Sequence, residues 1–318
     1  MEIRIISSEI IKPSSPTPPH LKTHNLSLID QLNLNIYFGY PLFYNRGDKS
    51  VVEISDHLKR SLSKTLTHYY PFAGRVRHDS FVDCDDSGVP FIEAYVDINM
   101  FEVLRKPEMN ILEQLLPYNP NKKVSTDDHP NLAVQINYFD CGGFAVCACF
   151  RHLIADASAA ALFLKNWAAV ARGFSDIKDV VFDCSSIFPP NELAKNITKN
   201  TIERQRSIDC VSKRFTFDGT KIASLIKEIA NRFKHRRRPT RFEVVSALIW
   251  GALISMAKES GDASPFILTP LNVRKRMNPP FPEECIGNVI FCVTGNWLDN
   301  EAVDYSSLAN KIHQLVRC

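Results

Sequence analysis

The chain has 318 residues, of which 45% are hydrophobic and 23% are charged. These fractions are close to those of soluble globular proteins, so they exclude a disordered or fibrous protein. The net charge of +3 is small for this length and favours neither nucleic acid nor an anionic membrane as the main partner. No apolar run of about 18 residues predicts a membrane-spanning helix, and the length suits two domains.

Nine cysteines are scattered along the chain without a Cys-x-x-Cys pair, a pattern that predicts reduced thiols. Residues 1–13 lack the basic start, apolar core and small-residue cleavage site of a secretory signal. We therefore predict a cytoplasmic protein. The sequons at Asn25 and Asn196 are then expected to stay unmodified, because a cytoplasmic chain does not meet the glycosylation enzymes.

The first half of the chain alternates between strand-like and helical segments. Isoleucines near the start predict a strand that ends in a proline-rich loop, and Tyr-Pro-Phe-Ala-Gly-Arg from Tyr70 ends the first helix in a turn. Asp-Cys-Gly-Gly from Asp140 joins two β-like runs and predicts a hairpin, because glycine accepts positive φ. The predicted elements are strands at 2–12, 37–44, 132–139 and 144–152 and helices at 52–66 and 157–172.

The second half begins after a segment that lacks hydrophobic periodicity. Residues 185–206 mix prolines, asparagines and lysines, and they are predicted to be the interdomain linker. The linker separates an N-terminal domain at 1–184 from a C-terminal domain at 207–318. In the latter we predict strands at 213–217, 266–273 and 288–293 and helices at 219–233, 241–258 and 306–316.

The pattern that could support catalysis is His-x-x-x-Asp, in which His152 and Asp156 lie between a predicted strand and a predicted helix. Imidazole is the side chain best suited to accept and return a proton near neutral pH, and the sheet would hold it rigidly. The same spacing also fits a buried histidine whose ring nitrogens bond to backbone, so the motif by itself leaves both interpretations open. No metal site is indicated, because no further ligands accompany His152 at metal spacing.

Several other motifs follow one another along almost the whole chain, in the order that a known family has. They include the Tyr-Pro-Phe-Ala-Gly-Arg turn and, together with His152 and Asp156, they resemble the BAHD family of plant acyl-CoA-dependent acyltransferases. Within that family they are most similar to the alkaloid O-acetyltransferases, judging by the stretches that start at Ile10 and Ile154. The matching stretches are 14–18, 26–30, 70–75, 152–156, 242–250, 272–276, 279–280 and 287–288.

This resemblance implies an α/β, two-domain fold of the chloramphenicol acetyltransferase type, with mixed sheets, flanking helices and a solvent channel between the domains. It implies acetyl-CoA or another acyl-CoA as co-substrate, no permanently bound cofactor, and a small-molecule alcohol such as an alkaloid as acceptor. His152 would act as the general base in a ternary complex of enzyme, donor and acceptor. A monomer is expected.

The resemblance also bears on Asp156, for which two interpretations stay open. Asp156 either orients His152 as the third member of a catalytic triad or forms a structural salt bridge. The resemblance favours the salt bridge, with Arg274 as its partner. A buried pair of this kind is costly to break from one side, so Asp156→Asn is expected to lose folded yield as well as rate.

Four residues lie on segments that the family uses to bind coenzyme A. Each of them also fits an ordinary helix or strand position, so they are candidates only. The basic run at 234–239 is either a solvated loop or a contact for a coenzyme phosphate. The candidate coenzyme-binding residues are Ser246, Thr269, Asn272 and Arg274.

The chain departs from the family pattern in two places. Ala157 stands where the family usually has glycine, which is tolerable if the backbone there has negative φ. No Asp-Phe-Gly-Trp segment is present, so the second domain is expected to be incomplete and the sequence to be a fragment or a short form. The alternative function is therefore a non-catalytic relative that binds coenzyme A or a ligand, or that partners a full-length enzyme. A condensation-type domain would need a second histidine where Arg151 stands.

Overall fold

The computed structural model describes residues 1–120, 124, 128–174, 177, 180–191, 212–232, 237–261, 266–297 and 303–317. They form two compact units, of which the first is Met1–Arg214 with Arg274–Val289 and the second is Phe215–Val273 with Ile290–Cys318. The sequence-based boundaries assign everything from 207 onward to one domain, whereas residues 274–289 pack with the first unit. Most of the predicted linker, residues 192–206, lies outside the described residues.

The first unit is built on a five-stranded mixed sheet. All neighbouring strands are antiparallel except β6 and β7, and this parallel pair needs a crossover, which α3 (Met100–Arg105) and α4 (Met109–Gln114) supply. The predicted hairpin is present between β7 and β8, with Gly142 at a φ of 81°. In spatial order the strands are β1 (Ile3–Ile11), β6 (Val89–Val96), β7 (Leu132–Phe139), β8 (Phe144–Arg151) and β3 (Tyr37–Tyr44).

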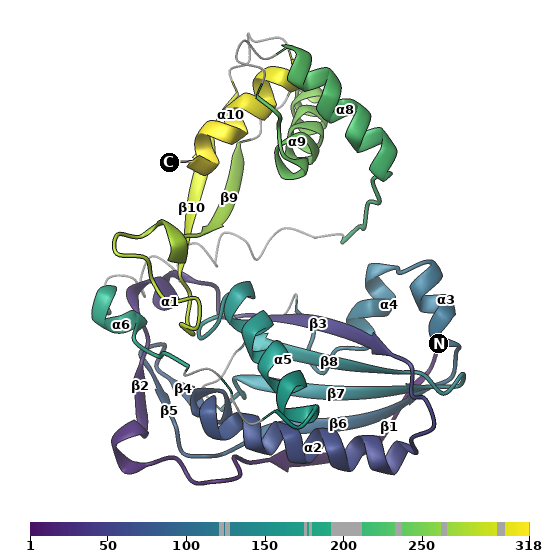
Figure 1. Ribbon diagram of the computed structural model, residues 1–318, viewed down its shortest axis with the longest axis vertical. Coiled ribbons are helices and arrows are strands. Elements are labelled where there is room, and N and C mark those ends of the chain that lie inside the picture. Colours follow the sequence, from purple (N-terminus) through teal and green to yellow (C-terminus); the bar gives the residue numbers. More distant parts are fainter. Residues whose placement is uncertain are drawn as a thin grey trace. The chain divides into compact units, whose positions relative to one another are not determined.

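Two helices, α2 (Val51–His68) and α5 (Ala157–Ala171), lie across one face of this sheet (Figure 1). Their apolar stripes meet the strands in an aromatic cluster, in which the rings of Phe72, Phe150 and Phe163 lie 5.2–5.7 Å apart. The helical periodicity of both segments therefore corresponds to a buried face, as predicted. Ala157 is the first residue of α5 and does not have positive φ, so the methyl group is accommodated there.

The opposite face of the sheet carries a smaller core. Met100 and Val103 of α3 pack there against Phe139 and Ala145. The first unit also contains a three-stranded sheet and several short helical segments. These are β2 (Thr23–Asn25), β5 (Phe81–Asp83) and β4 (Arg75–Arg77), the helices α1 (Leu28–Leu32) and α6 (Cys184–Ile187), and the 3-10 turns η1 (Pro19–Leu21), η2 (Tyr70–Ala73) and η3 (Arg274–Arg276).

The predicted turn after α2 is the 3-10 turn η2, and Gly74 leads from it into β4. Its φ of −94° is open to any residue, so conformational freedom does not explain the glycine. The reason is close packing: a Cβ at this position would lie 2.3 Å from the backbone oxygen of Asp83 and 2.9 Å from a methyl carbon of Val82. The backbones of the turn and of β5 approach too closely for a side chain.

We expect Gly74→Ala to lower the free energy of unfolding of the first unit by about 1–3 kcal/mol, because the methyl group overpacks against backbone that cannot move freely. Urea denaturation followed by fluorescence measures this loss. Gly219→Ala is the control, because nothing lies within 4 Å of a Cβ there and alanine favours the helix. Equal stability of Gly74→Ala and the unmodified chain would contradict the packing argument.

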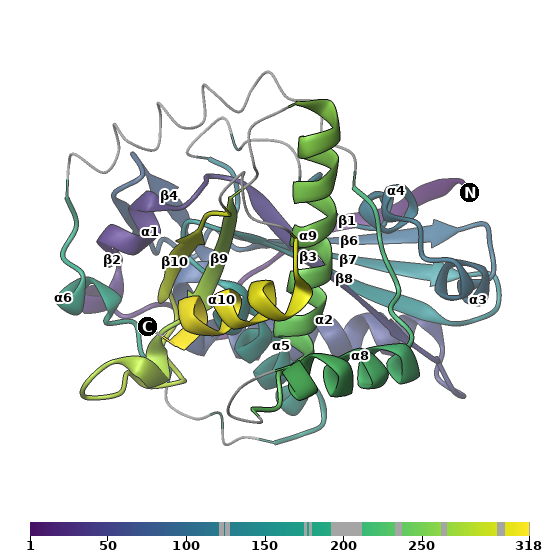
Figure 2. The same ribbon diagram turned by 90° about the horizontal axis from the view of Figure 1, so that it is seen from above.

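The second unit packs three helices with a two-stranded antiparallel ribbon. Figure 2 shows α10 beside the ribbon, and Trp250 of α9 meets Trp297 at a ring distance of 6.1 Å in the core. The strand predicted at 213–217 is wrong: residues 212–218 form no strand, and Phe215 and Phe217 are exposed instead of paired. The elements are α8 (Gly219–Arg232), α9 (Arg241–Ser260), β9 (Ile267–Asn272), β10 (Ile290–Gly295) and α10 (Tyr305–Arg317).

Candidate active site

His152 directly follows β8, at the strand-to-helix junction that the sequence predicts. Its backbone N–H donates to the carbonyl of Ile36 at 2.9 Å, and its carbonyl accepts from Nδ2 of Asn288 at 2.8 Å. The ring lies 5.0 Å from the ring of Phe38, measured between centroids. Both peptide groups of the histidine are thus anchored, one by the segment before β3 and one by the 274–289 segment.

The imidazole of His152 is half-buried, and its Nδ1 is buried. Among the residues that the structure describes, Nδ1 has no hydrogen-bond partner. The alternative of a histidine satisfied by backbone therefore does not apply to this nitrogen. A buried polar atom without a partner is unfavourable for stability, and a catalytic role is one explanation for such an atom.

Asp156 turns away from the imidazole and caps α5. Its Oδ1 accepts from the backbone N–H of Ala159 at 2.8 Å, and its Oδ2 accepts from Arg274 at 2.7 Å and from the N–H of Val289 at 3.0 Å. Asp156 is only 2% exposed. These donors occupy both carboxylate oxygens, so the geometry is that of the structural salt bridge and not of a triad.

Arg274 is 1% exposed and is the predicted partner of Asp156. Its guanidinium also donates to the carbonyls of Cys285, at 3.1 Å, and of Gly287, at 3.0 Å. The side chain thereby folds the 274–289 segment around itself and joins it to α5. This position does not suit the coenzyme-binding role predicted for Arg274, because the guanidinium points into the first unit and not to its surface.

Two further residues complete this environment, and the sequence analysis assigned them no role. Asp30 of α1 is buried and accepts from the backbone N–H and from Nδ2 of Asn288, both at 2.8 Å. Burial raises the pKa of the Asp30 carboxyl, and hydrogen bonds from Ser27 and Asn288 act in the opposite direction. The Ser-x-x-Asp spacing of Ser27 and Asp30, a capping box at the start of α1, is the signal that could have drawn attention to Asp30.

The other predicted coenzyme-binding residues belong to the second unit. Ser246 lies on α9 and is half-buried, whereas Thr269 and Asn272 lie on β9. Because side chains alternate along a strand, positions three apart point to opposite faces, and accordingly Thr269 is buried while Asn272 is exposed. The structure therefore does not gather Thr269 and Asn272 on one face of the ribbon.

The basic run at 234–239 lies partly outside the described residues. Within it, Arg237 donates to Glu243 at 2.7 Å, and Glu243 also bonds to His313 at 2.7 Å. Burial opposes ionisation of Glu243, but the hydrogen bonds from Arg237, Thr240 and His313 outweigh it and lower its pKa. Arg237 therefore stabilises the start of α9 through its bond to Glu243.

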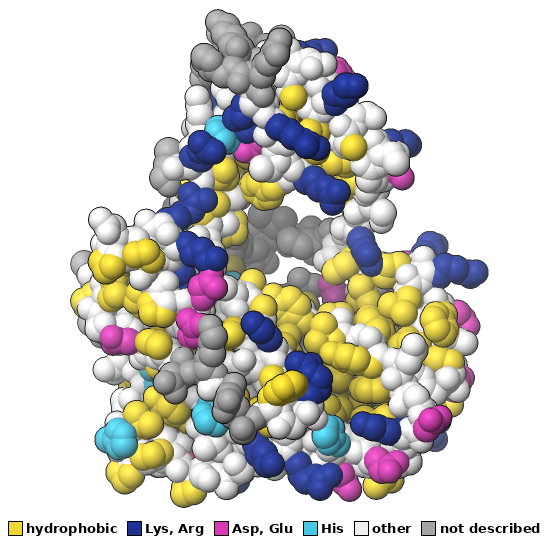
Figure 3. Space-filling model, viewed as in Figure 1, with side chains coloured by type: hydrophobic (Ala, Val, Ile, Leu, Met, Phe, Trp, Pro, Cys, Tyr) yellow, Lys and Arg dark blue, Asp and Glu magenta, His cyan; other side chains and the backbone are white. Residues whose placement is uncertain are grey.

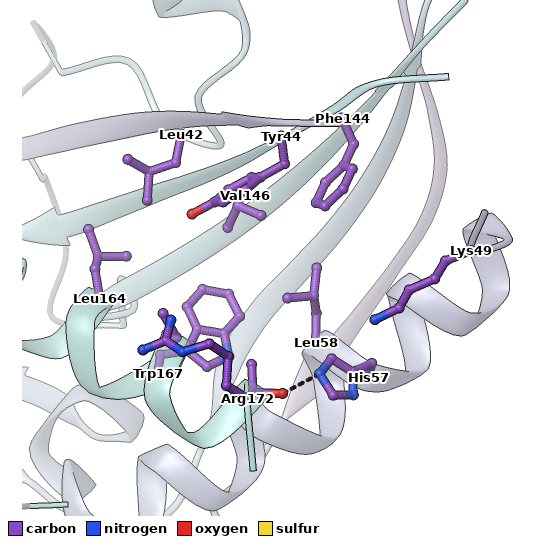
Figure 4. A pocket seen from close by; sticks show the side chains of 12 residues that line it. Leu42, Tyr44, Lys49, His57, Leu58, Phe144, Val146, Leu164, Trp167 and Arg172 are labelled. Atoms are coloured by element: carbon purple, nitrogen blue, oxygen red, sulfur yellow. Dashed lines mark hydrogen bonds between the residues drawn. The ribbon is translucent and has the colours of Figure 1, made fainter. Parts of the chain in front are cut away.

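A pocket of about 330 Å³ lies in another part of the first unit, between the sheet and helices α2 and α5 (Figure 4). Figure 3 shows hydrophobic side chains gathered where β3 and β8 run. Val146 in its wall stands six residues before His152, which corresponds to about 20 Å along a strand, so the pocket is separate from His152. Its lining is Leu42, Tyr44, Lys49, His57, Leu58, Phe144, Val146, Leu164, Trp167, Ala168, Ala171 and Arg172.

Within the described part of the chain, no helix has the length and hydrophobicity needed to span a membrane. The seven cysteines among the described residues are free thiols. Two of them, Cys184 and Cys285, pack with their sulfur atoms 3.0 Å apart and join α6 to the 274–289 segment.

Comparison with known proteins extends these observations. The family described as the Transferase family matches residues 1–315. Limonoid 21-O-acetyltransferase of Melia azedarach is 48% identical over 321 residues, which cover 100% of this chain and 74% of that protein.

Solved structures share the fold. The crystal structure of vinorine synthase matches with a TM-score of 0.84 and 33% identity over 99% of this chain and 76% of its own. The structure of F. sporotrichioides TRI101 with coenzyme A and T-2 matches with a TM-score of 0.68 over 92% of this chain and 73% of its own. Its identity of 16% shows the fold alone. Together they confirm the predicted fold class.

Proposed function

Since the chain belongs to the Transferase family, the BAHD acyltransferases, we propose that it moves an acetyl group from acetyl-CoA to a hydroxyl group of a small plant metabolite. Membership of this family identifies the chain as an acyltransferase. What we propose is the identity of the acyl donor, of the acceptor and of the general base. The proposed base is supported by the environment of His152. Its backbone is anchored at both peptide groups, while its Nδ1 lacks a partner among the described residues.

In the proposed reaction, Nε2 of His152 accepts the proton of the acceptor hydroxyl, because Nδ1 is the buried nitrogen. The hydroxyl oxygen attacks the thioester carbonyl and forms a tetrahedral intermediate. The carbon–sulfur bond then breaks, and His152 returns the proton to the sulfur of coenzyme A. General base assistance of this kind contributes about 10²- to 10⁴-fold in rate. Asp156 takes no part in the proton transfer and holds the junction through Arg274.

Coenzyme A is proposed to bind through the second unit. Ser246, Thr269 and Asn272 remain its proposed contacts, supported by the family resemblance of their segments, and hydroxyl and amide groups can donate to phosphate or pantetheine oxygens. Arg274 is not included, because it is buried against Asp156. No permanently bound cofactor is proposed.

For the acceptor, the relatives suggest two classes. The limonoid 21-O-acetyltransferase is 48% identical to this chain, so a limonoid alcohol is the first candidate. An alkaloid hydroxyl, which the sequence analysis predicted, is supported by the likeness to vinorine synthase at 33% identity. Acceptor specificity depends on pocket shape, and the higher sequence identity to the limonoid enzyme places the limonoid alcohol first.

The test is an assay of the purified chain with acetyl-CoA and, in separate reactions, a limonoid alcohol and an indole alkaloid alcohol. Release of the coenzyme A thiol and a gain of one acetyl group in the acceptor mass are measured. We expect turnover with the limonoid. Faster turnover with the alkaloid would make an alkaloid alcohol the proposed acceptor. Coenzyme binding without turnover of either acceptor would favour the non-catalytic alternative.

The proposal also covers a monomer in the cytoplasm. The free thiols of the described cysteines support a reducing compartment. Size-exclusion chromatography with light scattering checks the mass of the particle, and fractionation of the source cells checks the compartment.

A further inference from the structure

The carbonyl of His152 is held by a residue far away in the sequence. Asn288 donates to it through Nδ2 at 2.8 Å, across 136 positions. Asn288 is 0% exposed, so bulk water does not compete with this donor in the folded chain. The carbonyl that follows the proposed base therefore has a buried side chain as its hydrogen-bond donor.

Asn288 is itself held by Asp30. The same Oδ1 of Asp30 accepts from the backbone N–H and from Nδ2 of Asn288, both at 2.8 Å, while Oδ2 accepts from the backbone and the hydroxyl of Ser27 at 2.9 and 2.7 Å. The amide has only one acceptable orientation, because a reversed amide would place its oxygen against both the Asp30 carboxylate and the His152 carbonyl. Asp30 thus determines which way Asn288 points.

The junction needs such a support. Between the end of β8 at Arg151 and the start of α5 at Ala157, the backbone follows turns without regular pairing. The N–H of His152 is fixed by Ile36, and a turn is closed by the N–H of Ile154, which donates to the carbonyl of Arg151 at 3.1 Å, but neither bond holds the carbonyl of His152 itself. A rotation there would swing the imidazole, and small misplacements of a reacting group cost much of the rate.

We propose that Asn288, oriented by Asp30, is a positioning residue for His152. It acts through the backbone of the base and touches no reacting atom. The inference rests on the proposed role of His152. The ion pair of Asp156 and Arg274 holds the two neighbours of Asn288, since Arg274 donates to the carbonyl of Gly287 and Asp156 accepts from the N–H of Val289. Among the described residues, however, only Asn288 bonds to the carbonyl of His152.

The test compares Asn288→Ala with Asn137→Ala. Asn137 is equally buried and donates to the carbonyl of Leu115 at 2.9 Å, but it lies opposite Ala145, on the sheet face that packs against α3. Both variants lose a buried amide and should lose similar thermal stability. We expect Asn288→Ala to lower kcat by about 10²-fold with KM for acetyl-CoA within about twofold, whereas Asn137→Ala keeps kcat within about twofold.

The outcomes separate this inference from the proposed function. If His152→Ala is inactive while Asn288→Ala turns over at the native rate, the positioning role is wrong and the base stands. If His152→Ala keeps the native rate, the proposed function and this inference both fail. An equal loss of kcat in Asn137→Ala would also overturn the inference, because the loss would then be general.

A second variant covers the case in which Asn288→Ala does not fold. Asn288→Ser keeps the backbone N–H that donates to Asp30 and adds a hydroxyl that can donate to the same carboxylate. The shorter side chain does not span to the carbonyl of His152. We expect the same loss of kcat as for alanine, and native kcat in this folded variant would overturn the inference.

Discussion

The His152→Ala variant is expected to fold normally and to lose about 10²- to 10⁴-fold in kcat. The fold is spared because alanine retains the backbone bonds to Ile36 and Asn288 and removes a ring nitrogen that has no partner among the described residues. The contact with Phe38 is lost, at a cost of about 0.5–1.5 kcal/mol. Steady-state kinetics with acetyl-CoA and thermal denaturation of the same preparation measure both quantities.

His57→Ala is the matched control for this variant. His57 is half-buried like His152, and its Nε2 lies 2.6 Å from the carbonyl of Ala171, in the separate pocket between α2 and α5. We expect its kcat to stay near the native value. Near-native kcat in His152→Ala would contradict the general base, whatever the control shows.

The second large effect is expected at the ion pair. Asp156→Asn should lower the free energy of unfolding by about 3–5 kcal/mol, because it removes the carboxylate charge with which the buried guanidinium of Arg274 pairs. The segment that Arg274 organises should loosen at the same time, since its carbonyls share that guanidinium. Urea denaturation gives the stability, and the soluble yield gives the folded fraction.

An exposed ion pair of the same chain provides the comparison. Arg232 and Glu228 on α8 lie 3.0 Å apart with side chains 59% and 61% exposed, so Glu228→Gln should cost no more than about 0.5 kcal/mol. A stable and soluble Asp156→Asn variant with a low kcat would instead indicate that Asp156 assists His152 directly. That result would restore the triad interpretation.

The sequence by itself determined the elements whose signal is local. The periodicity of α2 and α5, the glycine-containing turn between β7 and β8, and the place of His152 at a strand end can each be identified within a short window. The order of motifs also indicated the family and the pairing of Asp156 with Arg274, which the structure contains. Each of these inferences depended either on residues close together in the sequence or on the resemblance to the family.

Only the tertiary structure decided what joins distant segments. Asn288 meets Asp30 across 258 positions, and the 274–289 segment belongs to the first unit because its arginine finds a buried carboxylate there. The segment at 213–217 alternates like a strand but pairs with no strand in the described part of the chain. Hydrophobic periodicity describes which face of an element is buried, whereas the partner of a buried polar group or a strand edge depends on which chain segments the whole fold brings together.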